Sequence, residues 1–180
     1  RVSMTLSAHL TSWVGNAYRH IPNDSAYDVL DFRFAGLSAE NRWNLPGQPT
    51  LYLAGDEGIL IAEWGRHFAV NRTPELQTKT VERPVFRLTL SIGSLLDLRD
   101  PAVWRELSLE NAPHAFLDRD LARATSNFVR ASTPAQGLLV PPVGFLDQPD
   151  RWSLVLFLEK LPDPGAFISA VMPRGLLRRA

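Results

Sequence analysis

The sequence predicts one α+β domain spanning residues 1–180, with short β-sheets and flanking helices. The chain has 180 residues, which is enough for one sizeable core. Strand-like segments do not alternate strictly with helix-like ones, so a doubly wound parallel sheet is not expected. Cysteine is absent, and so is an evident metal site, so two smaller domains would have neither disulfides nor a metal to stabilise them.

The N-terminal third predicts a helix, a strand and a long loop. Apolar residues fall at helical intervals over residues 6–14, and residues 17–21 form a short strand candidate that places Arg19 on or beside it. Residues 25–34, which include Tyr27, show no clean period, and no state is predicted for them. Residues 38–49 are rich in Asn, Pro and Gly and predict a loop.

A strand–turn–helix unit follows. Thr50–Ala54 is a compact strand candidate between Pro49 and Gly55. Asp56 is expected to cap a helix over residues 57–68, because a short carboxylate side chain satisfies the free amides of a first turn.

The second half predicts further strands and one long helix. Residues 85–92 alternate, with Phe86, Leu88, Leu90 and Ile92 on one face, and residues 95–98 form a short companion strand. Residues 118–131 predict a helix whose apolar stripe is Leu121, Ala124, Thr125 and Phe128. Residues 137–140 and 153–159 predict two late strands around a loop that contains Pro and Gly.

Composition narrows the class of partner. Nineteen basic residues balance nineteen acidic ones, so no overall charge attracts nucleic acid or an anionic membrane. The apolar runs are far shorter than the roughly 20 residues that span a bilayer, and we expect no signal peptide. A small molecule or a protein is the expected partner, and the lack of cysteine suits the cytoplasm.

Glu63 is the most informative residue. Its carboxylate lies beside the apolar stripe of the predicted helix, close to Ile59 and Leu60. Either it reaches water or pairs with Arg66 or His67 at the edge of the stripe, or it faces a cleft. Tyr52 in the preceding strand is either a core tyrosine or a second group directed at the same cleft.

Four further positions are candidate ligands of a phosphate or a ring. Arg42, Trp43 and Asn44 place a guanidinium beside an aromatic plane, and Arg19 is a second guanidinium that could donate to phosphate. Each arginine could equally be a partner in a structural ion pair. The four histidines show no metal-ligand spacing, so no metal is expected, and no Gly-rich phosphate loop or serine nucleophile motif is present.

In their order and spacing, these residues resemble the RES domain family. The resemblance rests on Tyr18-Arg19, Asn41-Arg42-Trp43-Asn44, Leu51-Tyr52-Leu53-Ala54 and Ala62-Glu63, and it continues through residues 96–98, 137–141 and 154–157. RES domains are toxins of bacterial toxin–antitoxin pairs, usually with an Xre-type antitoxin. The resemblance implies a fold like that of ADP-ribosyltransferases of the diphtheria-toxin type.

The resemblance also implies an activity. NAD would be the substrate, not a prosthetic group, and the nicotinamide–ribose bond would be cleaved with phosphate or water as acceptor. Glu63, Arg19 and Tyr52 would be catalytic, and Arg19, His20, Arg42, Trp43, Asn44 and Tyr52 would bind NAD. Transfer of ADP-ribose to a protein and a non-catalytic module that binds a partner are the alternatives. A bacterial cytoplasmic location, an Xre-type antitoxin partner and a homo-oligomer within such a complex are compatible with this reading.

Two segments depart from the family pattern. Glu40-Asn41 stands where many members have Gly-Gly, which restricts the backbone of the loop. Pro142 stands where the family has the Ser of its name, and proline has neither a hydroxyl nor an amide hydrogen. Ser126 or Ser153 could substitute for that serine, the serine could be dispensable, or the chemistry could be weakened.

Overall fold

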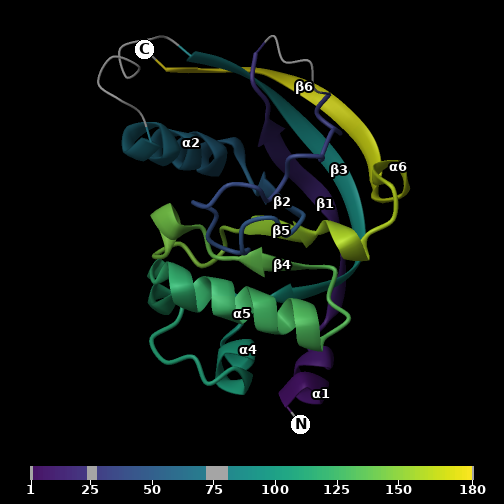
Figure 1. Cartoon of the computed structure of the whole chain (residues 1–180), viewed down its shortest axis with the longest axis vertical. Helices are drawn as coiled ribbons and strands as arrows, with labels where there is room; N and C mark the ends of the chain where they lie inside the picture. The colour runs from purple at the N-terminus through teal and green to yellow at the C-terminus, as the bar shows by residue number, and fades with distance from the viewer. Residues whose placement is uncertain (1, 24–27, 72–80, 180) are drawn as a thin grey trace.

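One mixed β-sheet organises the molecule. The computed structural model describes residues 2–23, 28–71 and 81–179. Its six strands lie in the order β1-β2-β5-β4-β3-β6, and β1 also pairs with β3 (Figure 1). The described strands are β1 Thr11–His20, β2 Thr50–Ala54, β3 Val81–Asp97, β4 Gly137–Val140, β5 Ser153–Phe157 and β6 Ile168–Arg179. The predicted α+β class is confirmed, although one six-stranded sheet replaces the expected short sheets.

The strand pairings explain why the sheet is not of the doubly wound kind. Only β3 and β4 pair in parallel, and the other described pairs are antiparallel. Strands β4 and β5 are buried along their whole length. Burial on both faces makes their sequences continuously apolar, not alternating. This pattern is why residues 137–140 and most of residues 153–159 could be identified as strands.

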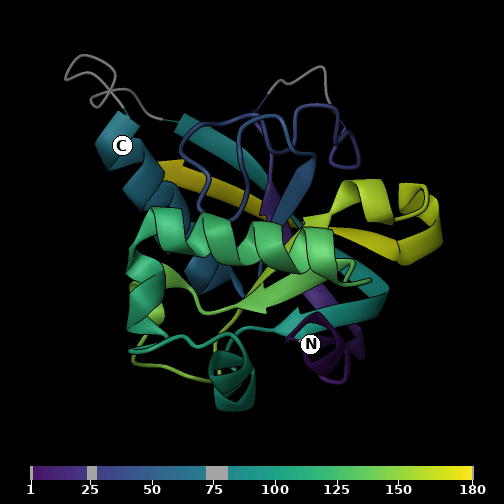
Figure 2. The same ribbon diagram turned by 60° about the horizontal axis from the view of Figure 1, so that its bottom comes forward.

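Helices pack against this sheet. The α-helices are α1 Val2–Ser7, α2 Glu57–Asn71, α4 Pro101–Glu106, α5 Arg119–Ser132 and α6 Pro164–Phe167. Figure 2 shows α5 running across the sheet, with α2 behind one of its ends. No helix among the described residues is long and apolar enough to cross a membrane.

The N-terminal helix prediction was largely wrong. Helix α1 ends at Ser7, and β1 begins at Thr11 and pairs with β3 as far as His20. Val14, which fitted the helical interval, is 73% exposed. Pairing with β3 supplies backbone hydrogen bonds that no local pattern encodes, so tertiary contact overrides the spacing. Within the undecided segment, residues 28–34 form turns, while Tyr27 lies outside the described residues.

Strand β3 is longer than predicted. Its 17 residues include residues 95–97 of the expected companion strand, so that separate strand does not exist. The β3–β6 register shifts between Val85 and Phe86. The extra residue of this bulge is in β6, because Val85 pairs with Gly175 and Phe86 with Pro173. The alternation of β3 is kept: Leu88, Leu90 and Ile92 lie in one core cluster, as predicted, and Phe86 packs against it. Strand β6, for which the sequence analysis made no prediction, covers this edge of β3.

Helix α5 lies where predicted but buries a different face. Its buried residues are Ala122, Thr125, Ser126, Val129 and Arg130, whereas Phe128 of the predicted stripe is 39% exposed. Arg130 can be buried because its guanidinium pairs with Glu159 at 2.6 Å and donates to the Pro49 carbonyl at 3.0 Å. A buried charge with such partners is tolerated, and the apolar pattern alone could not show it.

The strand–turn–helix unit was predicted correctly and sets the position of α2. The Asp56 carboxylate accepts a hydrogen bond from the Ile59 amide at 2.8 Å, as a helix cap does. Gly55 is required at the turn, because a Cβ there would meet the Trp152 carbonyl and would lie 2.9 Å from its indole ring. The turn before α2 therefore lies directly against Trp152, the residue that precedes Ser153.

Candidate active site

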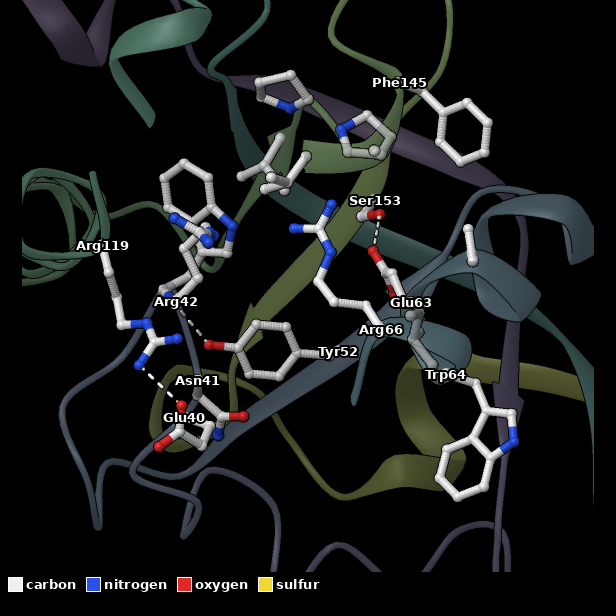
Figure 3. A pocket seen from close by; sticks show the side chains of 18 of the residues that line it. Glu40, Asn41, Arg42, Tyr52, Glu63, Trp64, Arg66, Arg119, Phe145 and Ser153 are labelled. Atoms are coloured by element: carbon white, nitrogen blue, oxygen red, sulfur yellow. Dashed lines mark hydrogen bonds and ion pairs between the residues drawn. The ribbon is translucent and has the colours of Figure 1, made fainter. Parts of the chain in front are cut away.

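A pocket of about 490 Å³ opens between the β2–α2 unit and two loops. This volume lies within the range of small-molecule sites. Strand ends, helix α2 and the loops around residues 40–43 and 140–145 all contribute to its lining (Figure 3). The lining residues are His20, Glu40, Asn41, Arg42, Trp43, Tyr52, Leu53, Ala62, Glu63, Trp64, Arg66, Arg83, Arg119, Val140, Pro141, Pro142, Val143, Gly144, Phe145 and Ser153.

Glu63 faces this pocket. Ile59 and Leu60 are buried beneath α2, and Glu63 points from the same helix towards β5. Its Oε1 accepts a hydrogen bond from the Ser153 hydroxyl at 3.1 Å. The side chain is exposed through the pocket mouth, yet the surrounding walls displace much of its hydration. This desolvation raises the pKa of Glu63 to about 7, against the opposing effects of Ser153 and the Arg66 charge.

Tyr52 is held by its hydroxyl. That group donates to Asn44 Oδ1 at 2.6 Å and accepts from the Trp43 amide at 3.0 Å. Desolvation by burial is the main reason why the pKa of Tyr52 is raised, so the phenol stays protonated at neutral pH. With its hydroxyl used in this way, the ring of Tyr52 is the part that lines the pocket.

Asn44 organises the loop and does not line the pocket. It is 1% exposed, and its Nδ2 donates to the Gly36 carbonyl at 2.9 Å and to the Leu45 carbonyl at 2.6 Å. Gly36 has a φ of 88°, which favours glycine. Asn44 was predicted to bind the ligand; the structure places it behind Tyr52, outside the residues that line the pocket.

Arg42 and Trp43 both line the pocket, from different depths. Arg42 Nη1 donates to the carbonyls of Phe116 and Leu117, both at 2.8 Å. Its Nε and Nη2 form no hydrogen bond within the part of the chain that the structure describes. Trp43 is only 4% exposed and packs against the Phe116 ring with centroids 5.1 Å apart. Trp43 is therefore mainly a core residue with an edge at the pocket.

The structure separates Arg19 from His20. Successive side chains of a strand point to opposite faces, so only one of these neighbours can face the pocket from β1, and that residue is His20. Arg19 turns away, donates to the carbonyls of Val29 and Asp31, and lies over the Phe32 ring. Arg19 therefore secures the turns after β1, and the pocket lining does not include it.

Several lining residues were missed as site residues by the sequence analysis. Arg66 was considered only as an ion-pair partner of Glu63, yet no salt bridge joins them. Arg83 donates to His20 Nδ1 at 2.6 Å, and Arg119 pairs with Glu40 at 2.9 Å. Arg66 lies one turn after Glu63, a spacing that could have revealed it. The other two come from distant segments and carry no local signal.

Ser153 is the serine that contacts Glu63. It is 7% exposed at the start of β5, whereas Ser126 is 1% exposed in α5 and lies outside the pocket lining. The sequence analysis left both open as substitutes for the serine absent at Pro142. The hydrogen bond to Glu63 favours Ser153. Pro142 lines the pocket with an apolar ring.

The pocket is electrically positive although the chain is neutral. Its lining contains the arginines Arg42, Arg66, Arg83 and Arg119 but only two acidic residues, Glu40 and Glu63. Arg119 and Arg66 both lower the pKa of Arg42, after desolvation, because like charges stand near it. Such a concentration of guanidinium groups suits a ligand with phosphates. Among the described residues, no group of three or more His, Cys, Asp or Glu side chains could hold a metal ion.

Comparisons with known proteins bear on the fold and the family. A chain of the M. tuberculosis MbcT–MbcA toxin–antitoxin complex has a similar fold, with a TM-score of 0.65 and 22% identity over 99% of this chain and 91% of that one. No curated protein matches the chain. The model of the RES domain matches residues 16–175, a span that contains every residue of the pocket lining. The chain belongs to the RES domain family.

Proposed function

We propose that this chain cleaves the nicotinamide–ribose bond of NAD, as the toxin of a bacterial toxin–antitoxin pair. The observation that carries the proposal is a carboxylate, Glu63, held by Ser153 inside a pocket that is otherwise rich in arginine. Membership of the RES family supports it, as does a similar fold in a toxin–antitoxin complex. An ADP-ribosyltransferase-like relationship is part of the same proposal.

Cleavage of the nicotinamide–ribose bond needs a negative charge beside the ribose. When the C1′–N bond breaks, its electron pair leaves with nicotinamide, which becomes neutral, and positive charge develops on the ribose. A fixed carboxylate beside that carbon stabilises the transition state. Glu63 fills this role in its ionised form, with the Ser153 hydroxyl holding its orientation.

The arginines position the pyrophosphate. Arg42 presents N–H groups that no described residue uses, and Arg66 extends from α2 beside Glu63 (Figure 3). Bidentate guanidinium–phosphate contacts fix both position and orientation. The structure directs Arg19 away from the pocket, so the proposal assigns no phosphate to it. The ring of Tyr52 provides a surface for nicotinamide.

Ser153 bears on whether the site is active. A module that had lost catalysis would have no need to hold a partly desolvated carboxylate with a hydrogen bond from a distant strand. The replacement of the family serine by Pro142 is therefore offset by a hydroxyl that arrives from β5. This geometry favours an enzyme over a non-catalytic binding module.

The positive charge of the pocket lining bears on which molecule accepts the ADP-ribose. After nicotinamide departs, phosphate or water adds at C1′; water loses a proton when it adds, whereas phosphate forms an ester directly. The excess of arginine in the lining favours phosphate. Cytoplasmic NAD is the proposed target, and an Xre-type antitoxin, in a complex that could contain several copies of the chain, is the proposed partner.

The test is release of nicotinamide from NAD by the purified protein, with and without inorganic phosphate. We expect release by the wild type that phosphate accelerates, and a loss of about 10²–10³-fold in kcat for Glu63→Gln. Glu57→Gln is the matched control, because Glu57 is in the same helix and pairs with Arg174 outside the pocket. Folded wild-type protein that releases no nicotinamide in either buffer contradicts the proposal. Labelling of a protein in cell extract would instead identify a transferase.

A further inference from the structure

One end of the pocket has no part in the chemistry at Glu63. It is formed by His20 of β1, Trp64 of α2 and Arg83 of β3, and all three line the pocket. We call these three residues the aromatic end. Because Trp64 follows Glu63 in the same helix, it projects to a different side of α2, as Figure 3 shows.

The aromatic end is a preassembled set of flat groups. The Trp64 and His20 rings meet edge to face, with centroids 5.2 Å apart and planes at 63°. The Arg83 guanidinium lies over the Trp64 ring at 4.8 Å from its centroid, and its Nε donates to His20 Nδ1 at 2.6 Å. Side chains locked together in this way lose little freedom when a planar ligand packs against them. Heterocyclic bases stack on aromatic rings and on guanidinium planes.

Charge selects which planar ring fits there. Desolvation and the nearby Arg19 charge lower the pKa of Arg83 to about 10, so it remains a cation at neutral pH. No acidic side chain of the lining pairs with it, because Glu40 pairs with Arg119 and Glu63 bonds to Ser153. NAD carries two rings, a cationic nicotinamide and a neutral adenine. Arg83 repels the first and stacks on the second.

We propose that the aromatic end binds the adenine ring of the substrate and thereby sets the direction in which the dinucleotide lies. Nicotinamide is then placed on the far side of Glu63, against the ring of Tyr52, where the carboxylate offsets its charge. The pyrophosphate lies between the two rings, within reach of Arg66. This inference rests on the proposed function for the identity of NAD, but adenine binding can be measured without any turnover.

Binding of AMP and of ribose 5-phosphate separates the adenine contact from the phosphate contact. Measured by calorimetry, Trp64→Leu is expected to weaken AMP about tenfold and to change ribose 5-phosphate by less than about twofold. Trp64→Phe keeps an aromatic plane and is expected to recover most of the AMP affinity. Phe128→Leu is the matched control, an aromatic-to-aliphatic change in α5 outside the pocket lining.

Turnover supplies a second readout. For Trp64→Leu we expect kcat/KM for nicotinamide release to fall about tenfold more with NAD than with nicotinamide mononucleotide, which lacks the adenosine half. Equal losses for both substrates, or AMP affinity that the variant leaves unchanged, would overturn the inference. A different outcome separates the two proposals. If the wild type releases no nicotinamide but binds AMP more tightly than Trp64→Leu does, the adenine site is supported and the proposed activity is contradicted.

Discussion

The pocket has two walls of different origin. The strand–helix wall consists of Tyr52, Glu63, Trp64 and Arg66, which all come from one continuous stretch of the chain. The loop wall consists of residues 141–145 and Ser153, which approach from the other half of the sequence. A hydrogen bond between Glu63 and Ser153, which are 90 positions apart, joins the two walls.

The two walls differ in how they are held. Tyr52 is fixed by two hydrogen bonds to the loop at residues 43–44, and the start of α2 by its Asp56 cap, so in this wall local contacts add to the pairing of β2 with β1 and β5. The loop wall depends on where β4 and β5 lie in the sheet. Local contacts therefore help to present the carboxylate of Glu63, while the tertiary fold supplies the Ser153 hydroxyl that orients it.

The largest effect on stability is expected at Tyr52, where the strand–helix wall contacts the loop at residues 43–44. Tyr52→Phe leaves the Trp43 amide and the buried Asn44 carbonyl oxygen without their partner, which costs about 1–3 kcal/mol. The urea midpoint measures the loss. Tyr18→Phe is the control, since the Tyr18 hydroxyl makes no hydrogen bond with any residue that the structure describes. Equal midpoints for the two variants would mean that Tyr52 does not hold the loop.

Removing the contact between the walls should change activity and its pH dependence together. Ser153→Ala is expected to lower kcat about tenfold. Because the Ser153 hydroxyl lowers the pKa of Glu63, its removal raises that pKa further above about 7. The wild-type rate should rise with pH through about 7, as Glu63 ionises, and this limb should move to higher pH in Ser153→Ala. Ser153→Thr should restore both; a loss of rate with an unmoved limb would indicate a purely structural role.

Glu63 is expected to reduce stability above neutral pH. The pKa of Glu63 is higher in the folded protein than the ordinary value of 4.5. Its contribution to the free energy of unfolding is therefore fully present below pH 4.5 and is lost as the pH rises through about 7. Glu63→Gln should therefore be the more stable protein at pH 8, by on the order of 1 kcal/mol. The effect is smaller than full burial would give, because solvent reaches the side chain. Thermal unfolding at pH 5 and pH 8 tests this, and a pH-independent difference would contradict it.

The smallest effect is expected from restoring the family serine in the loop wall. Pro142→Ser should change kcat by less than about twofold, because Ser153 already donates to Glu63. In a Ser153→Ala background, Pro142→Ser should raise kcat by a larger factor than it does in the otherwise wild-type protein, because the hydroxyl of Ser153 is then missing. A large gain in the otherwise wild-type protein would show that Ser153 does not replace the missing hydroxyl.

Much of the strand–helix wall could be predicted from the sequence, and little of the loop wall could. Thr50–Ala54, the Asp56 cap and the start of α2 follow from turn residues and apolar spacing, which act over a few residues. Tyr52 and Glu63 were therefore identified as pocket candidates. Arg19 was assigned to the pocket together with His20, although strand alternation allows only one of them to face it.

The sequence by itself determined the α+β class, the strand–turn–helix unit and the residues that resemble the RES signature, because short-range spacing and residue type carry this information. Only the tertiary structure decided that Ser153 contacts Glu63, that Arg83 and Arg119 join the pocket and that Arg19 leaves it. These outcomes depend on strand pairing between distant segments. Such pairing is selected by the burial of the whole sheet, and no single segment encodes it.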